Sequence, residues 1–429
     1  MKKVLIVTYY WPPAGGPGVQ RWLKFVKYLP EFGIEPIVYV PENPTYPIID
    51  ESLLEEVSKN TKIISQPIFE PYGLAKYFSR KKVKTMSSGL ISEGKKQSFI
   101  EKSLLFIRGN FFIPDARKFW VKPSVKFLSK FISSENIDTI ITTGPPHSLH
   151  LIGLELKKKK NEKLRWIADF RDPWTTIGYQ EKLLLTKSSD EKHRKLETDV
   201  LQSADLIVTT SFSTRKEFQE KTKKPVETIT NGFDDLELKN EIPLDEKFTF
   251  SHIGSLLSGR NPENLWKAFS ELLQENSAFK KAFKLRLIGK VSSDVLHSLN
   301  DFGLEKYLDL FGYVSHEKAM EFQQKSQVLL LLEIDSQITQ GIIPGKLFEY
   351  MRSNRPILAI GPKNWDAAKI ISETSTGKFF GYDEKEKIKH QIQNYFLEFL
   401  KGSLRTNPQG IEVYSRRELT KKLSEIIFK

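Results

Sequence analysis

Short apolar runs typical of β-strands alternate with helical patterns along the chain, and the alternation occurs as two successive series. Strands separated by helices form βαβ units, whose strands are parallel. The first series has expected strands at residues 3–8, 35–39, 61–65, 139–143, 165–169, 206–210 and 226–230. The second has them at 248–253, 284–288, 308–311, 328–332 and 356–360. The pattern predicts an α/β protein with two Rossmann-like domains.

Helical patterns fill the intervals between these strands. They cover residues 19–29, 262–273, 293–299, 316–324, 345–352, 384–400 and 414–428. Asn231-Gly232 and the polar residues 234–247 divide the two series. We therefore expect an N-terminal domain at 1–240, a C-terminal domain at 241–410, and a final helix within 411–429 that packs back toward the N-terminal domain. Because ligands bind at the carboxyl ends of parallel strands, a cleft between facing domains is the expected site.

Composition indicates a soluble globular protein and limits its chemistry. Of the 429 residues, 39% are hydrophobic and 28% are charged, and none is cysteine. Disulfides, thiolate metal sites and cysteine nucleophiles are therefore excluded. The N-terminus resembles no signal peptide, and no run approaches the roughly 20 apolar residues that span a bilayer. We expect a cytoplasmic protein.

The net charge of +13 is unevenly distributed. Residues 76–130 hold 14 Lys and Arg against three acidic residues, together with many large apolar side chains. Such a mixture is typical of a segment that touches an anionic membrane surface. The alternative is a solvated basic loop and helix around a core. No nucleic-acid-binding motif accompanies the charge, so nucleic acid is not an expected partner.

Residues 251–269, SHIGSLLSGRNPENLWKAF, combine a strand end, a Gly/Ser turn and a helix start. We expect Asn261 to be the N-cap and Pro262 the first helical residue. Free N–H groups at such a terminus favour an anion, and Arg260 would add a bidentate contact to a phosphate. A capped helix after a glycine turn also occurs without any ligand, and this alternative stays open.

Residues 340–362, QGIIPGKLFEYMRSNRPILAIGP, contain a second helix start of this kind. Lys346, Glu349 and Tyr350 fall at i, i+3 and i+4, so they are expected on one helical face. A carboxylate there can accept hydrogen bonds from both hydroxyls of a ribose, and the lysine can reach a diphosphate. The alternative is a surface ion pair worth less than about 1 kcal/mol. Two phosphate-type stretches in one domain favour a nucleotide-diphosphate site.

Six motifs in this order resemble the family-4-like retaining glycosyltransferases of GT-B architecture, over nearly the whole chain. They are GGPG at 15–18, PPHS at 145–148, DFRDPW at 169–174, ITNGFD at 229–234, GSLLSGR at 254–260 and GKLFEY at 345–350. The resemblance implies transfer of a sugar from a nucleotide-sugar donor with retention of configuration. It places the donor mainly in the C-terminal domain and the acceptor in the N-terminal one.

Carried over residue by residue, the resemblance assigns Arg260 and Lys346 to the donor diphosphate and Glu349 to the ribose. The further expected donor-binding residues are Gly16, Gly254, Ser255, Lys290, Gly345 and Leu347. Arg260, Lys346, Asp172 and His147 are the expected catalytic residues. The expected acceptor- or sugar-binding residues are Trp11, Gly15, Gly18, Arg171 and Trp174.

The sequence departs from the family pattern at two positions. The first of two glutamates that family members carry eight positions apart falls on Gly341. The lysine that usually follows the arginine by five residues falls on Leu265, and Lys346 or Lys290 would substitute for it.

Several residues of the N-terminal domain allow two readings each. GGPG lacks the G-x-G-x-x-G spacing, so we expect a turn that helps at the cleft edge and not a dinucleotide cradle. His147 ends a strand and either hydrogen-bonds a substrate or caps a helix; a metal site with His150 is not favoured because a third ligand is missing. Asp172 lies near the reacting sugar or caps a helix. Trp11 and Trp174 stack on a sugar or pack the wall of the cleft.

The resemblance implies a mechanism in which the leaving phosphate assists the incoming hydroxyl, so that the enzyme stabilises the diphosphate and positions the acceptor. No Asp-x-Asp motif occurs, so we expect metal-independent catalysis without a cofactor. The expected acceptor is a saccharide or a lipid-linked glycan, at the inner face of the membrane, in surface polysaccharide or lipopolysaccharide synthesis. The alternatives are a GT-B-fold nucleotide-sugar 2-epimerase and a non-catalytic GT-B protein that binds a glycan or a partner.

Overall fold

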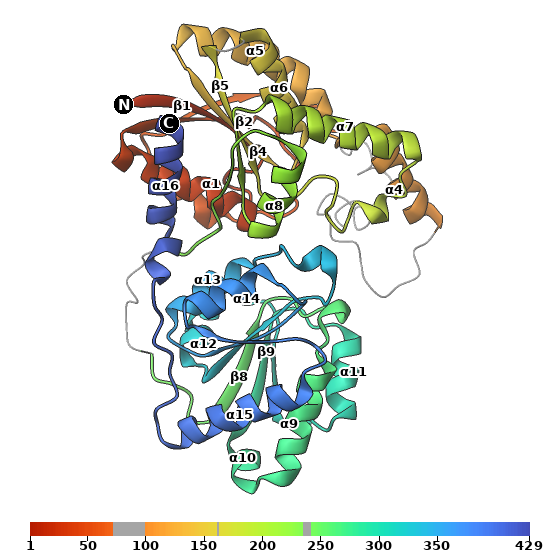
Figure 1. The fold of residues 1–429 in the computed structure, drawn as a ribbon, viewed down its shortest axis with the longest axis vertical. Coiled ribbons are helices and arrows are strands. Elements are labelled where there is room, and N and C mark those ends of the chain that lie inside the picture. Colours follow the sequence, from red (N-terminus) through yellow and green to blue (C-terminus); the bar gives the residue numbers. More distant parts are fainter. Residues whose placement is uncertain (72–98, 161–162, 235–241) are drawn as a thin grey trace. The chain divides into compact units, whose positions relative to one another are not determined.

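Two parallel sheets organise the chain in a computed structural model, which describes residues 1–71, 99–160, 163–234 and 242–429 (Figure 1). Each sheet belongs to a separate unit. Unit 1 comprises Met1–Asn231 and Arg416–Lys429, and unit 2 comprises Gly232–Ser415. The predicted boundary at residue 240 and residues 76–98 of the basic stretch lie outside the described residues.

The sheet of unit 1 has the strand order β3-β2-β1-β4-β5-β6-β7. Its strands are β1 (Lys2–Val7), β2 (Ile34–Pro41), β3 (Lys62–Gln66), β4 (Thr139–Gly144), β5 (Arg165–Phe170), β6 (Leu206–Thr209) and β7 (Val226–Thr228). All neighbouring strands are parallel. Its helices are α1 (Pro17–Tyr28), α4 (Phe99–Phe111), α5 (Lys118–Ser134), α6 (Ser148–Lys160), α7 (Lys187–Ser203), α8 (Phe212–Lys221) and α16 (Arg416–Phe428).

The sheet of unit 2 has the order β10-β9-β8-β11-β12-β13 and is also parallel. Its strands are β8 (Phe248–Ile253), β9 (Phe283–Ile288), β10 (Leu308–Phe311), β11 (Val328–Leu332), β12 (Ile357–Ile360) and β13 (Gly377–Phe380). Its helices are α9 (Glu263–Glu275), α10 (Ser277–Ala282), α11 (Ser293–Asp301), α12 (His316–Lys325), α13 (Gly345–Arg352), α14 (Asp366–Glu373) and α15 (Lys385–Leu400). The prediction of two Rossmann-like α/β domains is confirmed, whereas β13 was not predicted.

Buried apolar side chains cover both faces of the sheet in unit 1. One cluster includes Leu5, Tyr39 and Trp120, and the other includes Ile6, Trp22 and Val38. The strand β4 is buried along its whole length, as expected for a central strand of a parallel sheet between two helical layers. Unit 2 has one large cluster of its own around β8 and β11.

The final helix α16 packs in unit 1, as predicted. It lies beside α1 (Figure 1), and its residues Leu419, Leu423, Ile426 and Ile427 are buried in the same cluster as the apolar face of α1. Arg165 of β5 donates hydrogen bonds to the carbonyl oxygens of Ile426 and Ile427. These bonds occupy carbonyl groups that a helix end leaves without an internal partner. No helix in the described ranges combines the length and the apolar character needed to cross a membrane.

Candidate functional site

The strand order of unit 2 creates a topological switch point between β8 and β11. The chain adds β9 and β10 on one side of β8 and then returns to add β11, β12 and β13 on the other side. Ligands of parallel α/β sheets bind beyond the carboxyl ends of the strands at such a point. Gly254 follows β8 and Glu333 follows β11. The residues around these two positions form the candidate site.

Lys346, the second residue of α13, extends its ammonium group over Gly254. A Cβ atom at Gly254 would lie 2.7 Å from Lys346 Nζ. Gly254 also has a φ of +119°, a backbone conformation that other residues rarely adopt. Lys346 Nζ lies 3.4 Å from Nε2 of His252, a fully buried residue of β8. A glycine at this turn therefore allows the lysine to reach the end of the central strand.

Arg260 lies in a short 3-10 turn, η5 (Ser258–Arg260), between β8 and α9. Its Nε donates to Glu333 Oε1 at 2.9 Å. The Glu333 side chain is only 2% exposed, whereas that of Arg260 is 29% exposed. Burial and the Arg260 guanidinium together lower the pKa of Lys346 to about 8. Two cations thus converge at the switch point, an arrangement suited to a multiply charged anion.

The other predicted donor residues contribute in different ways. Ser255 follows Gly254 in the turn, and Gly345 is the first residue of α13. The side chain of Leu347 is fully buried, and its N–H donates to Pro344 O. Leu347 is therefore a packing residue. The side chain of Lys290 is exposed after β9, and its role as a substitute for a family lysine stays a prediction.

Glu349 makes hydrogen bonds to α12. Its Oε2 accepts from Gln323 Nε2 at 3.0 Å, and its Oε1 lies 3.3 Å from His316 Nε2. The next residue, Tyr350, is fully buried, and its hydroxyl oxygen accepts from Ile253 N. The expected shared face is therefore divided, because Tyr350 belongs to the core while Lys346 and Glu349 remain partly exposed. The ribose contact of Glu349 stays a prediction.

The helix start after Arg260 was predicted one residue too early. Pro262 is the N-cap, and α9 begins at Glu263. The Asn261 side chain makes tertiary contacts instead of a cap: its Oδ1 accepts from Trp266 Nε1 and its Nδ2 donates to Ser298 Oγ. Leu265, which occupies the place of a family lysine, is fully buried in the core of unit 2.

The opening GGPG loop of unit 1 is a turn from β1 into α1. Gly16 has a φ of +103°, and the helix begins at Pro17. Gly15 donates its N–H to Ile48 O. A Cβ atom at Gly18 would lie 1.9 Å from Nη1 of Arg171, so this glycine is required by the guanidinium packed against it. Gly18 and Arg171, predicted separately, are therefore neighbours.

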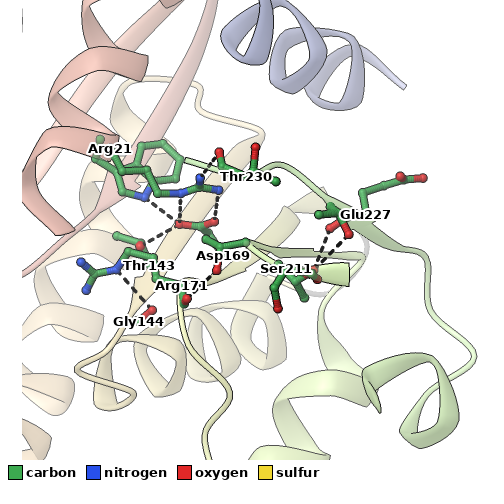
Figure 2. Close-up of polar contacts among 12 residues, drawn as sticks. Arg21, Thr143, Gly144, Asp169, Arg171, Ser211, Glu227 and Thr230 are labelled. Atoms are coloured by element: carbon green, nitrogen blue, oxygen red, sulfur yellow. Dashed lines mark hydrogen bonds and ion pairs between the residues drawn. The ribbon is translucent and has the colours of Figure 1, made fainter. Parts of the chain in front are cut away.

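Asp169 of the DFRDPW motif lies in a buried hydrogen-bond network (Figure 2). Its carboxylate accepts from Arg21 Nη2 at 2.8 Å, Trp22 Nε1 at 2.8 Å and Thr143 Oγ1 at 2.9 Å. Burial opposes its ionisation, but Arg21 and these donors keep the pKa of Asp169 below its usual value. Arg21 also donates to Thr230 O. Asp169 of β5 is therefore linked to α1 and β4, and through Arg21 to Thr230, which follows β7.

Three residues after Asp169, the chain is accessible at Asp172. Asp172 is exposed, and no helix begins there, so the capping alternative is wrong. Arg171 lies between the two aspartates in the sequence and donates through Nε to Gly144 O at 3.3 Å (Figure 2). It also hydrogen-bonds to Pro145 O. The predicted catalytic role of Asp172 stays a prediction.

His147 and Trp174 are buried together in unit 1. Their rings stack at 4.9 Å with an interplanar angle of 3°. Trp174 Nε1 donates to His193 Nδ1, and only 1% of the Trp174 side chain is exposed. Burial lowers the pKa of His147 well below its usual range, so the ring is neutral. The structure therefore favours packing for Trp174, and Trp11 is likewise buried.

The capping alternative for His147 is also wrong. Neither of its ring nitrogens has a hydrogen-bond partner among the described residues. Asp115 takes that role instead, because its carboxylate accepts from the N–H and the hydroxyl of Ser148, the first residue of α6. His150 Nδ1 hydrogen-bonds to Thr142 Oγ1. Across the described part of the chain, no group of three or more His, Asp or Glu side chains has an arrangement suited to a metal ion.

Two residues of the unit 2 site were not predicted, namely His252 and Glu333. His252 lies within a buried strand, and nothing in the sequence distinguishes a single histidine there from an ordinary core residue. Glu333 directly follows the apolar strand VLLLL, and this strand-end position was the signal that could have identified it. Their partners, Lys346 and Arg260, are distant in sequence and adjacent only in the fold.

No family model matches the sequence, and no curated protein is significantly similar to it. Solved structures do resemble the fold over the full chain. The TarM structure from S. aureus, solved with UDP, has a TM-score of 0.59 at 12% identity and covers 100% of both chains. The lipopolysaccharide outer core galactosyltransferase WaaB has a TM-score of 0.58 at 13% identity, with 100% of this chain and 99% of that chain covered.

A structure described as that of a UDP-N-acetylglucosamine 2-epimerase from Listeria monocytogenes is similar as well. Its TM-score is 0.53 at 13% identity, over 100% of this chain and 96% of the other. Sequence identities of 12–13% support a shared fold and give no information about a shared activity. Together with the two parallel sheets, these likenesses show that the chain has the GT-B glycosyltransferase fold.

Proposed function

We propose that the protein is a retaining glycosyltransferase that moves a sugar from a nucleotide-diphosphate sugar to a saccharide or lipid-linked acceptor. The observation that carries this proposal is the convergence of Arg260 and Lys346 at the switch point of unit 2, beside the bare backbone of Gly254. The TarM structure, which contains UDP, supports a nucleotide donor for a chain of this fold.

The two cations suit the chemistry of a departing nucleoside diphosphate. Negative charge builds on the diphosphate as the glycosidic bond breaks, and fixed positive groups stabilise that charge most effectively where water is partly excluded. Arg260 and Lys346 supply these groups from unit 2. Because the side chains already supply positive charge, we propose that transfer needs no divalent cation.

Nucleotide binding is the first test of this proposal. A thermal-shift series with UDP, GDP, ADP and CMP should raise the unfolding temperature for at least one diphosphate, because a ligand that binds the folded state stabilises it. The Arg260→Gln and Lys346→Met variants should show a smaller shift, because each removes one positive charge, and should lose most of the transfer activity. Activity should persist in a chelator. No shift with any diphosphate would contradict the proposed donor site, and a strict Mn²⁺ or Mg²⁺ requirement would contradict metal independence.

A nucleotide-sugar 2-epimerase is the second candidate, since a structure with that description shares the fold. An epimerase converts the nucleotide sugar without any acceptor, whereas a transferase releases the nucleotide. Incubation with the donor alone, followed by chromatography of the products, separates the two. Epimerised nucleotide sugar would favour the second candidate, and acceptor-dependent nucleotide release would favour the first.

We further propose that the acceptor is presented at an anionic membrane surface, in the synthesis of lipopolysaccharide or another surface polysaccharide. The similarity to WaaB, a lipopolysaccharide galactosyltransferase, supports this setting. The exposed residues Phe69, Phe111 and Phe119, together with Phe112, form what we call the aromatic surface of unit 1. Lys118 lies over the rings of Phe112 and Phe119 at 5.6 and 5.3 Å.

Neighbouring residues extend the mixed character of this surface. Phe106 and Ile107 of α4 are exposed, as are Lys102 and Lys122. Apolar side chains that enter the headgroup region and lysines that meet anionic lipids bind a membrane together. The aromatic surface therefore supports a peripheral association through unit 1.

A further inference from the structure

In unit 2, each of the two site cations contacts a different buried acceptor. Arg260 Nε donates to the carboxylate of Glu333 at 2.9 Å. Lys346 Nζ lies 3.4 Å from the imidazole Nε2 of His252. Both acceptors are almost fully buried, at the ends of the adjacent strands β8 and β11.

The tautomer of His252 is set by its contact to Leu330 O, and the backbone of Ser255 also lies near the ring. His252 Nδ1 lies 3.1 Å from Leu330 O, and a carbonyl oxygen only accepts, so Nδ1 carries the proton. The lone pair of Nε2 then faces the Lys346 ammonium group, which donates. Burial and the charge of Lys346 lower the pKa of His252 well below its usual range. The imidazole is therefore a neutral acceptor that orients the lysine without cancelling its charge.

Glu333 holds Arg260 in a different manner. Its Oε1 also accepts from Ile334 N at 2.9 Å, which fixes the carboxylate relative to the strand end. Arg260 uses Nε for this ion pair, and no other described residue accepts from its terminal nitrogens. The outer edge of the guanidinium thus stays available for a phosphate, while its charge is partly balanced by Glu333.

We propose that His252 and Glu333 are positioning residues that orient Lys346 and Arg260 toward the donor diphosphate before it binds. This inference rests on the proposed function. It adds an unequal division of contacts: Arg260 is hydrogen-bonded to a carboxylate, whereas the ammonium group of Lys346 lies against a neutral imidazole. A site held in this geometry loses less side-chain entropy on binding.

A double-mutant cycle tests this coupling. His252→Asn keeps a donor for Leu330 O but has no group at the position of Nε2, and His252→Gln places an amide oxygen near that position. The nucleoside diphosphate that stabilises the wild-type protein is titrated calorimetrically. We expect His252→Asn to weaken binding about tenfold in the wild type and less than about twofold beside Lys346→Met, because coupled residues are not additive. Glu333→Gln should behave likewise beside Arg260→Gln, and His252→Gln should restore most of the affinity.

Equal losses in both backgrounds, with folding intact, would overturn the positioning role and leave the proposed function standing. If no diphosphate binds, a measurement on the protein without ligand still tests the positioning role of His252. The ¹³Cε chemical shift of Lys346 reports its titration, and His252→Asn should lower the pKa of Lys346 because the ammonium group loses an acceptor. An unchanged titration would overturn the positioning role on its own, whatever the outcome for the function.

Discussion

Lys346 carries a charge whose presence depends on pH within the range of ordinary assays. Its pKa is lowered to about 8 by burial and by Arg260. A bound diphosphate favours the ammonium form, so binding above pH 8 requires the lysine to take up a proton. We expect the affinity for the nucleoside diphosphate to fall about 20-fold between pH 7.5 and 9.5, since each pH unit beyond the pKa costs a factor of ten.

The matched variant for this prediction is Lys346→Arg, which stays charged over the whole range. Its affinity should be nearly constant between pH 7.5 and 9.5, even if it is weaker at pH 7.5. Isothermal titration in buffers of constant ionic strength measures both proteins. A wild-type affinity that does not change with pH would show that Lys346 makes no charge contact to the diphosphate.

Asp169 provides a stability prediction, because its carboxylate is buried with Arg21 (Figure 2). Asp169→Asn leaves the guanidinium without its counterion, and breaking a buried pair costs about 3–5 kcal/mol. The pKa of Asp169 is lowered in the folded protein, so the contribution is complete above the unfolded pKa of about 3.9 and is lost as the pH falls through the folded value. Urea unfolding followed through unit 1 should show a loss that is larger at pH 7 than at pH 3.

The control is the second aspartate of the same motif. Asp172 is exposed, so Asp172→Asn should change the free energy of unfolding by less than about 0.5 kcal/mol. If both variants unfolded at the same urea concentration as the wild type, the network around Asp169 would not stabilise unit 1. The two variants thus distinguish a buried carboxylate that stabilises unit 1 from an exposed carboxylate in the same motif.

At the scale of single residues, the sequence identifies candidate site residues only where a local pattern distinguishes them. Arg260 and Lys346 lie at strand-to-helix transitions rich in glycine and proline, where unpaired N–H groups favour anions. His252 has no local signal and Glu333 has only its position at a strand end, because the roles of both depend on partners more than 70 residues away. The burial of Trp174 and His147 was not predictable either, since aromatic packing partners are set by the tertiary fold.

At the scale of elements, the periodicity of apolar residues predicted most strands of both sheets to within one or two residues. The edge strand β13 was missed because it has only four residues and its burial is partial. The N-cap before α9 was misplaced because Asn261 forms tertiary hydrogen bonds that compete with a local cap. Local rules thus failed where side chains had tertiary partners.

The helix α16 provides a prediction at this scale. It is distant in sequence from the rest of unit 1, yet Leu423 is only 2% exposed in the core beside α1. Leu423→Ala should destabilise unit 1 by about 2–5 kcal/mol, the usual cost of removing a buried leucine side chain. Hydrogen exchange should show faster opening of β1 and α1, with unchanged protection in unit 2. The exposed neighbour Lys421→Ala is the control, and equal protection in all three proteins would contradict the packing role of α16.

At the scale of the whole molecule, the net positive charge is concentrated in unit 1. The chain carries a net charge of +13, with much of the excess in residues 76–130. The fold and the two-sheet organisation were predictable from this sequence, because parallel βαβ units leave few topologies. The structural role of the basic stretch was less predictable. Only its part from residue 99 onward is described, and there aromatic side chains are exposed beside the lysines.

The last prediction concerns this aromatic surface. Phe111 and Phe119 are 65% and 43% exposed, so replacing both with serine should leave the fold intact while removing apolar area that would enter the headgroup region. We expect the partition of the protein onto vesicles with about 30% anionic lipid to fall roughly tenfold, and binding to weaken further with salt. Cosedimentation measures this partition. Leu397→Ser in unit 2, where the side chain is 55% exposed, is the matched control and should bind like the wild type. An equal loss in both variants would show that exposed apolar residues act nonspecifically, and binding unaffected by the phenylalanine changes would place the membrane contact outside the aromatic surface.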